Sequence, residues 1–75
     1  MVTFLTHTGQ KAPLGVALER AGLSQAALAR ALDCHPTAVS RWVRGKVRPH
    51  RFYRRRIVST LRRHGVDVTE GELWP

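Results

Sequence analysis

Four polar side chains recur at helical spacing near the middle of the chain, and their chemistry is hydrogen bonding. They follow an i, i+3, i+4, i+7 pattern, so one face of a helix would carry Thr37, Ser40, Arg41 and Arg44. The Arg41 guanidinium can bond to guanine O6 and N7 together, and the Thr37 hydroxyl can donate, accept or contact a thymine methyl. Arg44 falls near the helix end, where it could contact a phosphate or a base. This polar stripe predicts recognition of base edges.

Catalytic and metal-binding side chains are few by comparison. The plausible metal ligands are Cys34, His35, His50 and His64, and their spacing matches no zinc motif. No acidic residue lies between Asp33 and Asp67, which excludes paired-carboxylate catalysis in that region. We therefore expect no enzymatic activity, and neither a metal, a cofactor nor a small-molecule substrate.

Length and charge favour a binding module. The 75 residues allow one domain, whose folding buries only about 60 % of the surface exposed by the unfolded chain. Lys and Arg number 13 against 5 Asp and Glu, giving a formal net charge of +8. Such an excess favours a phosphate polymer or an anionic membrane as partner. The basic residues of the acid-free region are Arg41, Arg44, Lys46, Arg48, Arg51, Arg54, Arg55, Arg56, Arg62 and Arg63.

The chain shows no sign of export or membrane insertion. Residues 1–10 lack the basic region and apolar run of a signal peptide. No apolar stretch approaches the roughly 20 residues of a membrane span. A single cysteine, Cys34, excludes an internal disulfide and fits a reducing compartment. We expect a cytoplasmic, nucleoid-associated protein.

Two amphipathic segments precede the polar stripe and must position it. We expect the first helix at about 12–21, with Pro13 at its first position and Gly22 ending it. The second helix follows at once, with Ser24 as its N-cap. Gln25 lies in its first turn, beside backbone N–H groups that readily bind a phosphate.

The third helix should carry the polar stripe over 36–44. Asp33 tolerates the left-handed turn before it, and Cys34 should face inward as a small apolar plug. Pro36 suits the first helical position. It would also be the first base-contacting residue, limited to apolar contact.

These segments together resemble a known family. The stretches ALERAGLSQAALARAL and PTAVSRWVRGKVRP are similar to the helix-turn-helix of Cro and phage-repressor regulators, and GVDVTEGELWP resembles the closing segment of small Cro-like and Ner-like phage proteins. The resemblance implies a compact, all-α, lambda-repressor-like domain of four to five helices, with a helix-turn-helix formed by the second and third. It implies a DNA-binding protein that represses or tunes transcription. The chain departs from the family pattern at Asp33 and at His35-Pro36.

A fourth helix is expected from Pro49 to His64, with an apolar face formed by Tyr53, Ile57 and Leu61 and widened by Phe52 and Val58. Its remaining positions are crowded with arginines that repel one another. They could bind phosphate or form a solvated basic face, and for Arg54, Arg55, Arg56, Arg62 and Arg63 the sequence leaves both possibilities open. The predicted phosphate contacts are Gln25, Arg44, Lys46, Arg48, Arg51 and Arg54.

The two ends of the chain receive different predictions. Residues 1–10 are expected to form an arm, extended into an adjacent groove or simply frayed, before a single domain at 11–75. Thr69 and Glu72 have the spacing of a capping box, which predicts a one-turn helix at about 70–73. Trp74 should then complete the core or contact a second subunit.

The function that the sequence favours is sequence-specific binding of double-stranded DNA by a transcriptional repressor, with Pro36, Thr37, Ser40 and Arg41 contacting bases. One domain of this size covers one half-site, so a homodimer on a pseudo-palindromic operator is expected. The alternative is an RNA-binding or protein-binding adaptor that uses the arginine-rich helix.

Overall fold

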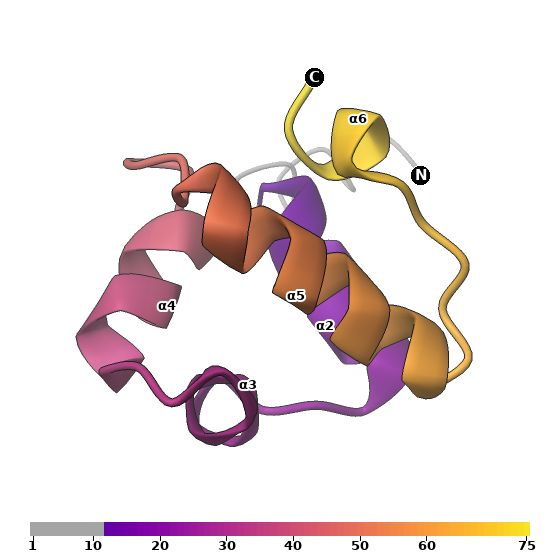
Figure 1. The fold of residues 1–75 in the computed structure, drawn as a ribbon, viewed down its shortest axis with the longest axis horizontal. Helices are drawn as coiled ribbons and strands as arrows, with labels where there is room; N and C mark the ends of the chain where they lie inside the picture. The colour runs from indigo at the N-terminus through magenta and orange to yellow at the C-terminus, as the bar shows by residue number, and fades with distance from the viewer. Residues whose placement is uncertain (1–11) are drawn as a thin grey trace, which may run out of the picture.

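The computed structural model describes residues 12–75, and every regular element in that range is a helix (Figure 1). The helices are α2 (Pro13–Ala21), α3 (Gln25–Leu32), α4 (Pro36–Val43), α5 (Arg51–Arg63) and α6 (Glu70–Leu73). This confirms the all-α fold and the short helix near the end of the sequence. The predicted arm at residues 1–10 lies outside the described residues.

The helix starts follow the capping rules on which the predictions relied. Pro13 and Pro36 occupy first-turn positions of α2 and α4. The Ser24 hydroxyl accepts a hydrogen bond from the Ala27 N–H at 3.0 Å. At α6 the capping box is complete, because the Thr69 N–H donates to Glu72 Oε1 at 2.9 Å and the Glu72 N–H donates to the Thr69 hydroxyl at 3.3 Å.

The four longer helices end alike, each followed by a residue in the left-handed conformation. The residues with positive φ are Gly22 (69°), Asp33 (57°), Gly45 (76°) and Gly65 (87°). At each end a backbone N–H reaches back five residues, as the Cys34 N–H does to the Ala29 carbonyl at 3.0 Å. Asp33 is the one non-glycine residue of residues 12–75 with positive φ, as predicted for the turn before α4. The chain reversal between α3 and α4 therefore depends on an aspartate where glycine would be least strained.

The start of α5 differs from the prediction. The helix begins at Arg51, and Pro49 lies buried before it in non-helical backbone. His50 is the N-cap, with its Nδ1 accepting the Phe52 N–H at 3.1 Å. Pro49 was expected to open the helix because proline suits a first turn, but here its carbonyl accepts a hydrogen bond from Arg54 Nη1 at 3.0 Å.

In the described part of the chain, all five helices, from α2 through α6, contribute to one hydrophobic core. Its fully buried side chains come from four helices: Leu14, Leu28, Leu32, Val39, Ile57 and Leu61. Cys34 is partly buried against this cluster, as are Tyr53 and Trp74. The prediction for Phe52 was wrong, since this side chain is 56 % exposed. At 100° per residue Phe52 stands roughly 140° from Ile57 around α5, too far to share its buried face.

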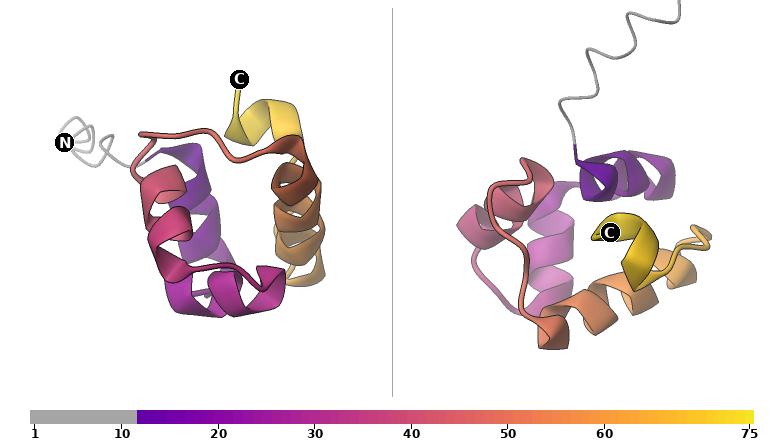
Figure 2. Two further views of the ribbon diagram at one scale, coloured as in Figure 1. Left: turned by 60° about the vertical axis from the view of Figure 1, so that its left-hand side comes forward. Right: turned by 90° about the horizontal axis from the view of Figure 1, so that it is seen from above.

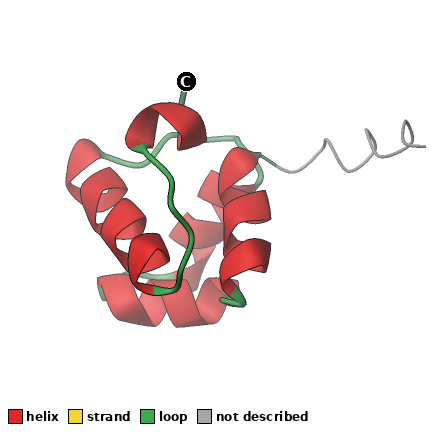
Figure 3. Cartoon of the chain, turned by 90° about the vertical axis from the view of Figure 1, so that its right-hand side faces the viewer, coloured by secondary structure: helices red, strands yellow, loops and turns green. Residues whose placement is uncertain are grey.

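The arrangement places the polar stripe at one end of the molecule. In Figure 1, α4 lies at the left and α5 runs across the front to end at the right. Figure 2 shows from above that α6 lies between α2 and α5. The loop after α5 then climbs along one side of the molecule to reach α6 (Figure 3). Within residues 12–75, no helix has the length and apolar character needed to cross a membrane.

Candidate nucleic-acid interface

Helices α3 and α4 form the predicted helix-turn-helix pair, joined by Asp33, Cys34 and His35. Leu28, Ala29 and Leu32 on α3 belong to the same buried cluster as the inner face of α4. Ala29 is 2 % exposed, and its small side chain allows the two helices to approach closely. The angle of the pair is therefore set by apolar packing.

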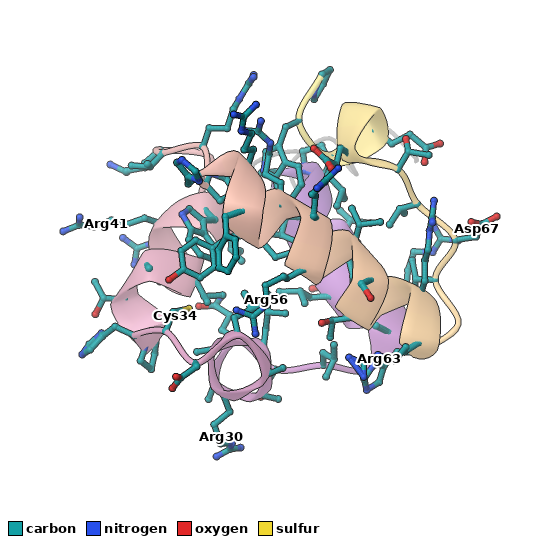
Figure 4. All side chains as sticks on the ribbon, viewed as in Figure 1. Arg30, Cys34, Arg41, Arg56, Arg63 and Asp67 are labelled. Carbon is teal, nitrogen blue, oxygen red and sulfur yellow. The ribbon has the colours of Figure 1, made fainter. Side chains whose placement is uncertain are left out.

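The outer face of α4 carries the polar stripe as the spacing predicts. Thr37, Arg41 and Arg44 are exposed and Ser40 is half-buried, whereas Val39 and Trp42 on the inner face are buried. Arg41 points away from the body of the molecule (Figure 4). Within the described range, no hydrogen bond or ion pair occupies these four polar side chains. They are available to an external partner.

His35 contributes to the start of α4 in a way that the sequence reasoning missed. Its Nδ1 accepts a hydrogen bond from the Thr37 N–H at 3.1 Å, so histidine takes the N-cap place of a serine or threonine. Because a backbone N–H can only donate, Nδ1 is the acceptor in this bond, and Nε2 is the ring nitrogen left to donate outward. The side chain is exposed. His35 thus holds a hydrogen-bond donor beside Pro36 and Thr37.

His50 caps α5 by the same geometry, so a histidine just before a predicted helix start was the signal available in the sequence.

Gln25 lies where the start of α3 meets the end of α4. It lines a hollow of about 230 Å³ together with Gly15, Ser24 and Val43. The Ala12 N–H donates to the Val43 carbonyl at 3.3 Å, which ties the start of α2 to the same place. The first turn of α3 is therefore held next to the last turn of α4, as a shared contact with one phosphate backbone requires.

The basic residues after α4 differ in how many hydrogen bonds and ion pairs they form within the fold. Lys46 and Arg51 are exposed, and neither forms a hydrogen bond or ion pair within residues 12–75. Arg48 is exposed and its Nη2 donates to the Pro75 carbonyl at 3.1 Å. Arg54 is only 26 % exposed, with Nη1 on the Pro49 carbonyl and Nε 3.5 Å from Glu70 Oε1. Its guanidinium therefore joins the start of α5 to α6, and fewer of its donors remain for a phosphate.

The arginines in the second half of α5 lie far from the polar stripe. Figure 4 shows Arg41 at one end of the molecule and Arg63 near the other. The Arg62 Nε donates to the Val68 carbonyl at 3.2 Å and lies 4.0 Å from Asp67 Oδ1. Arg56 stands over the Phe52 ring, with 5.3 Å between its Cζ and the ring centroid. A duplex bound on α4 would be distant from Arg62 and Arg63.

Cys34 is a half-buried residue of the turn, as expected for a small apolar plug. Burial raises the pKa of its thiol, the Asp33 carboxylate acts in the same direction, and the Arg56 guanidinium lowers it. The thiol therefore remains protonated and weakly nucleophilic at neutral pH. Nowhere in the described part of the chain do three His, Cys, Asp or Glu side chains gather as metal ligands would.

Comparison with known proteins places this geometry in a family. A family model described as a helix-turn-helix domain matches residues 17–72. No curated protein and no solved structure matches the chain. The chain belongs to the helix-turn-helix domain family, and membership implies DNA binding.

Proposed function

We propose that this helix-turn-helix protein is a sequence-specific regulator of transcription that inserts α4 into the major groove of double-stranded DNA. The observation that supports this most directly is the outer face of α4, where exposed donors stand without partners opposite a buried apolar face. An α-helix fits the major groove, where each base pair presents a distinct pattern of donors and acceptors.

The base contacts in this proposal are Pro36, Thr37, Ser40 and Arg41. Arg41 donates to a guanine, while Thr37 and Ser40 bond to neighbouring bases. Pro36 offers apolar contact only. His35 adds a donor at the same end of α4, because its cap bond occupies Nδ1 and leaves Nε2 to donate outward.

The phosphate contacts flank α4 on both sides. Gln25 and the first turn of α3 bind one strand, and the remaining contacts come from Arg44, Lys46, Arg48 and Arg51. Gln25 and these four basic side chains are all exposed. We assign Arg54 chiefly to holding α6, since the Pro49 carbonyl and Glu70 already engage its guanidinium.

We further propose a repressor of the Cro and phage-repressor type, acting in the cytoplasm at the nucleoid. One such domain spans one half-site, so two copies would bind a pseudo-palindromic operator. The Ser24-Gln25 start of α3 and the packing of Leu28, Ala29 and Val39 support this type.

A competition shift assay tests the proposal. A labelled duplex bound by the protein is challenged with unlabelled duplex or with RNA of equal length, at one salt concentration. The proposal predicts that duplex DNA competes better, because A-form RNA has a deep, narrow major groove that side chains cannot enter. Preferential displacement by RNA would refute it.

A further inference from the structure

A second polar surface lies between α5 and α6, on a side of the molecule that does not include α4. It is a groove of about 730 Å³, within the size range of ligand sites. We name it the arginine groove; its lining is Arg55, Val58, Ser59, Arg62, Arg63, Thr69, Glu70 and Gly71. No residue of α3 or α4 contributes to it.

The two walls of the arginine groove differ in charge. The α5 wall carries three guanidinium groups, of which Arg55 and Arg63 make no hydrogen bond or ion pair within residues 12–75. The third, Arg62, donates to the Val68 carbonyl through Nε, and the same nitrogen lies 4.0 Å from Asp67 Oδ1, so Asp67 partly balances its charge. The α6 wall carries Glu70, whose charge Arg54 already balances. The groove therefore has uncompensated positive charge at Arg55 and Arg63 on α5, and hydrogen-bond acceptors along α6.

This combination fits a peptide better than a nucleic acid. Arginine bonds bidentately to carboxylate and phosphate groups, so the α5 wall would bind anionic side chains. A peptide also has backbone N–H groups, which could donate to the Glu70 carboxylate and the Thr69 hydroxyl. A nucleic-acid backbone presents phosphate oxygens and has no comparable row of N–H donors for these acceptors.

The length of the groove agrees with an extended segment. Arg55 and Arg62 are seven residues apart on α5, which is roughly 11 Å at 1.5 Å per residue. Three to four residues of extended chain, at about 3.3 Å each, span that distance. Val58 lines the groove between the arginines, but it is 8 % exposed, so it contributes only a small apolar area to the floor.

We propose that the arginine groove binds an extended peptide segment of a partner protein that bears carboxylate side chains. Such recognition by arginine clusters is a recurrent mode of peptide binding. The proposal uses a face separate from α4, so it would connect a DNA-bound copy of the chain to another protein.

Titration of the 75-residue chain followed by backbone amide NMR tests this. The probes are an eight-residue peptide of alternating glutamate and glycine, the same peptide with phosphoserine for glutamate, and the same peptide with glutamine. The anionic peptides should shift the amides of Ser59, Thr69 and Gly71 and leave those of Ser40 and Arg41 in place. The glutamine peptide should have no effect. The phosphoserine peptide, which carries more charge per residue, should shift the same amides, and shifts with the phosphoserine peptide alone would overturn the choice of carboxylate.

The matched variants are R55Q/R63Q and R41Q. The double variant should weaken the peptide at least about tenfold and keep its thermal unfolding temperature, because neither side chain has an internal partner. R41Q should bind the peptide normally. The proposal is overturned if the shifts centre on α4, if the double variant binds the peptide unchanged, or if a single-stranded RNA octamer shifts the same amides more tightly. Duplex binding measured on the same proteins tests the DNA-binding proposal separately.

Discussion

The outer face of α4 and the exposed side of α5 both carry arginines, but the structure treats them differently. Arg41 stands among hydroxyls, free of internal partners, at one end of the molecule. On α5, Arg54 holds the Pro49 carbonyl and Glu70, and Arg62 holds the Val68 carbonyl. We therefore expect DNA contact to depend less on the number of arginines in a segment than on the face where each one lies and on whether it already has a partner within the fold.

The largest effect should come from removing Arg41. We expect Arg41→Ala to weaken binding to the preferred duplex by about 1–3 kcal/mol, or roughly 5- to 150-fold, and to relax specificity at one base pair. A quantitative shift assay on the preferred duplex and on single-base variants measures both.

Arg63→Ala is the matched control, because it removes another exposed arginine without an internal partner, from the other region. It should change duplex affinity by less than about threefold, through net charge alone. If Arg41→Ala weakened binding to all sequences equally, Arg41 would be a phosphate contact. If Arg63→Ala had the larger effect, the assignment of the two regions would be reversed.

The next effect concerns stability. Arg54→Ala removes one contact to the Pro49 carbonyl and one to Glu70 on α6, and we expect it to lower the free energy of unfolding by about 1 kcal/mol, with a fall of roughly 4–8 °C in Tm. Thermal unfolding followed by circular dichroism measures this. Arg55→Ala, one residue away and without an internal partner, should leave Tm nearly unchanged. A loss of duplex affinity at unchanged Tm would instead make Arg54 a phosphate contact.

A smaller effect should appear in the salt dependence. If about five phosphates are neutralised, the logarithm of affinity should fall with the logarithm of salt concentration at a slope near −4.5. Lys46→Ala should reduce that slope by about one and weaken all sequences alike. Arg63→Ala should leave the slope unchanged, and an equal reduction in both variants would show that the α5 arginines also contact the duplex.

The turn before α4 provides a further test of what holds the polar stripe. Asp33→Gly relieves the left-handed strain and should stabilise the domain by about 0.5 kcal/mol, after the entropic cost of glycine is subtracted. Asp33→Asn tolerates the same conformation without the charge, so its Tm should match the parent. An equal rise in both variants would mean that charge, not backbone conformation, is the cause.

The smallest expected effect is on the alkylation rate of the Cys34 thiol. With the pKa of its thiol raised, Cys34 should be alkylated by iodoacetamide at pH 8 more slowly in the folded chain than in denaturant. Asp33→Asn should speed the reaction and Arg56→Ala should slow it, because the carboxylate raises this pKa and the guanidinium lowers it. Unchanged rates in both variants would rule out these charges as causes.

The local features of the fold were largely predictable from sequence because they depend on near neighbours. Ser24, Thr69 and the glycines after the helices act within one turn, and apolar spacing identified the buried faces except at Phe52. The start of α5 was misplaced because proline before a helix can be its first residue or a packed residue ahead of it. His50 decides between them here by capping the helix.

The candidate site was less predictable wherever it depends on distant residues. Helical spacing alone determines which residues share the outer face of α4, so the sequence was enough to predict that face. The partners of Arg54 and Arg62 lie on α6 and in the loop before it, and no spacing rule relates those residues to α5. The arginine groove, formed by α5 and α6 together, could not be anticipated for the same reason.

Selection of bound sequences from a random duplex pool, performed with the parent chain and Arg41→Ala in parallel, tests most directly whether α4 determines sequence specificity. The parent should enrich one motif, arranged as two half-sites if two copies bind, and Arg41→Ala should lose the preference at one guanine while keeping the rest. Enrichment of no motif by the parent, or of the same complete motif by both proteins, would contradict the assignment of base recognition to the outer face of α4.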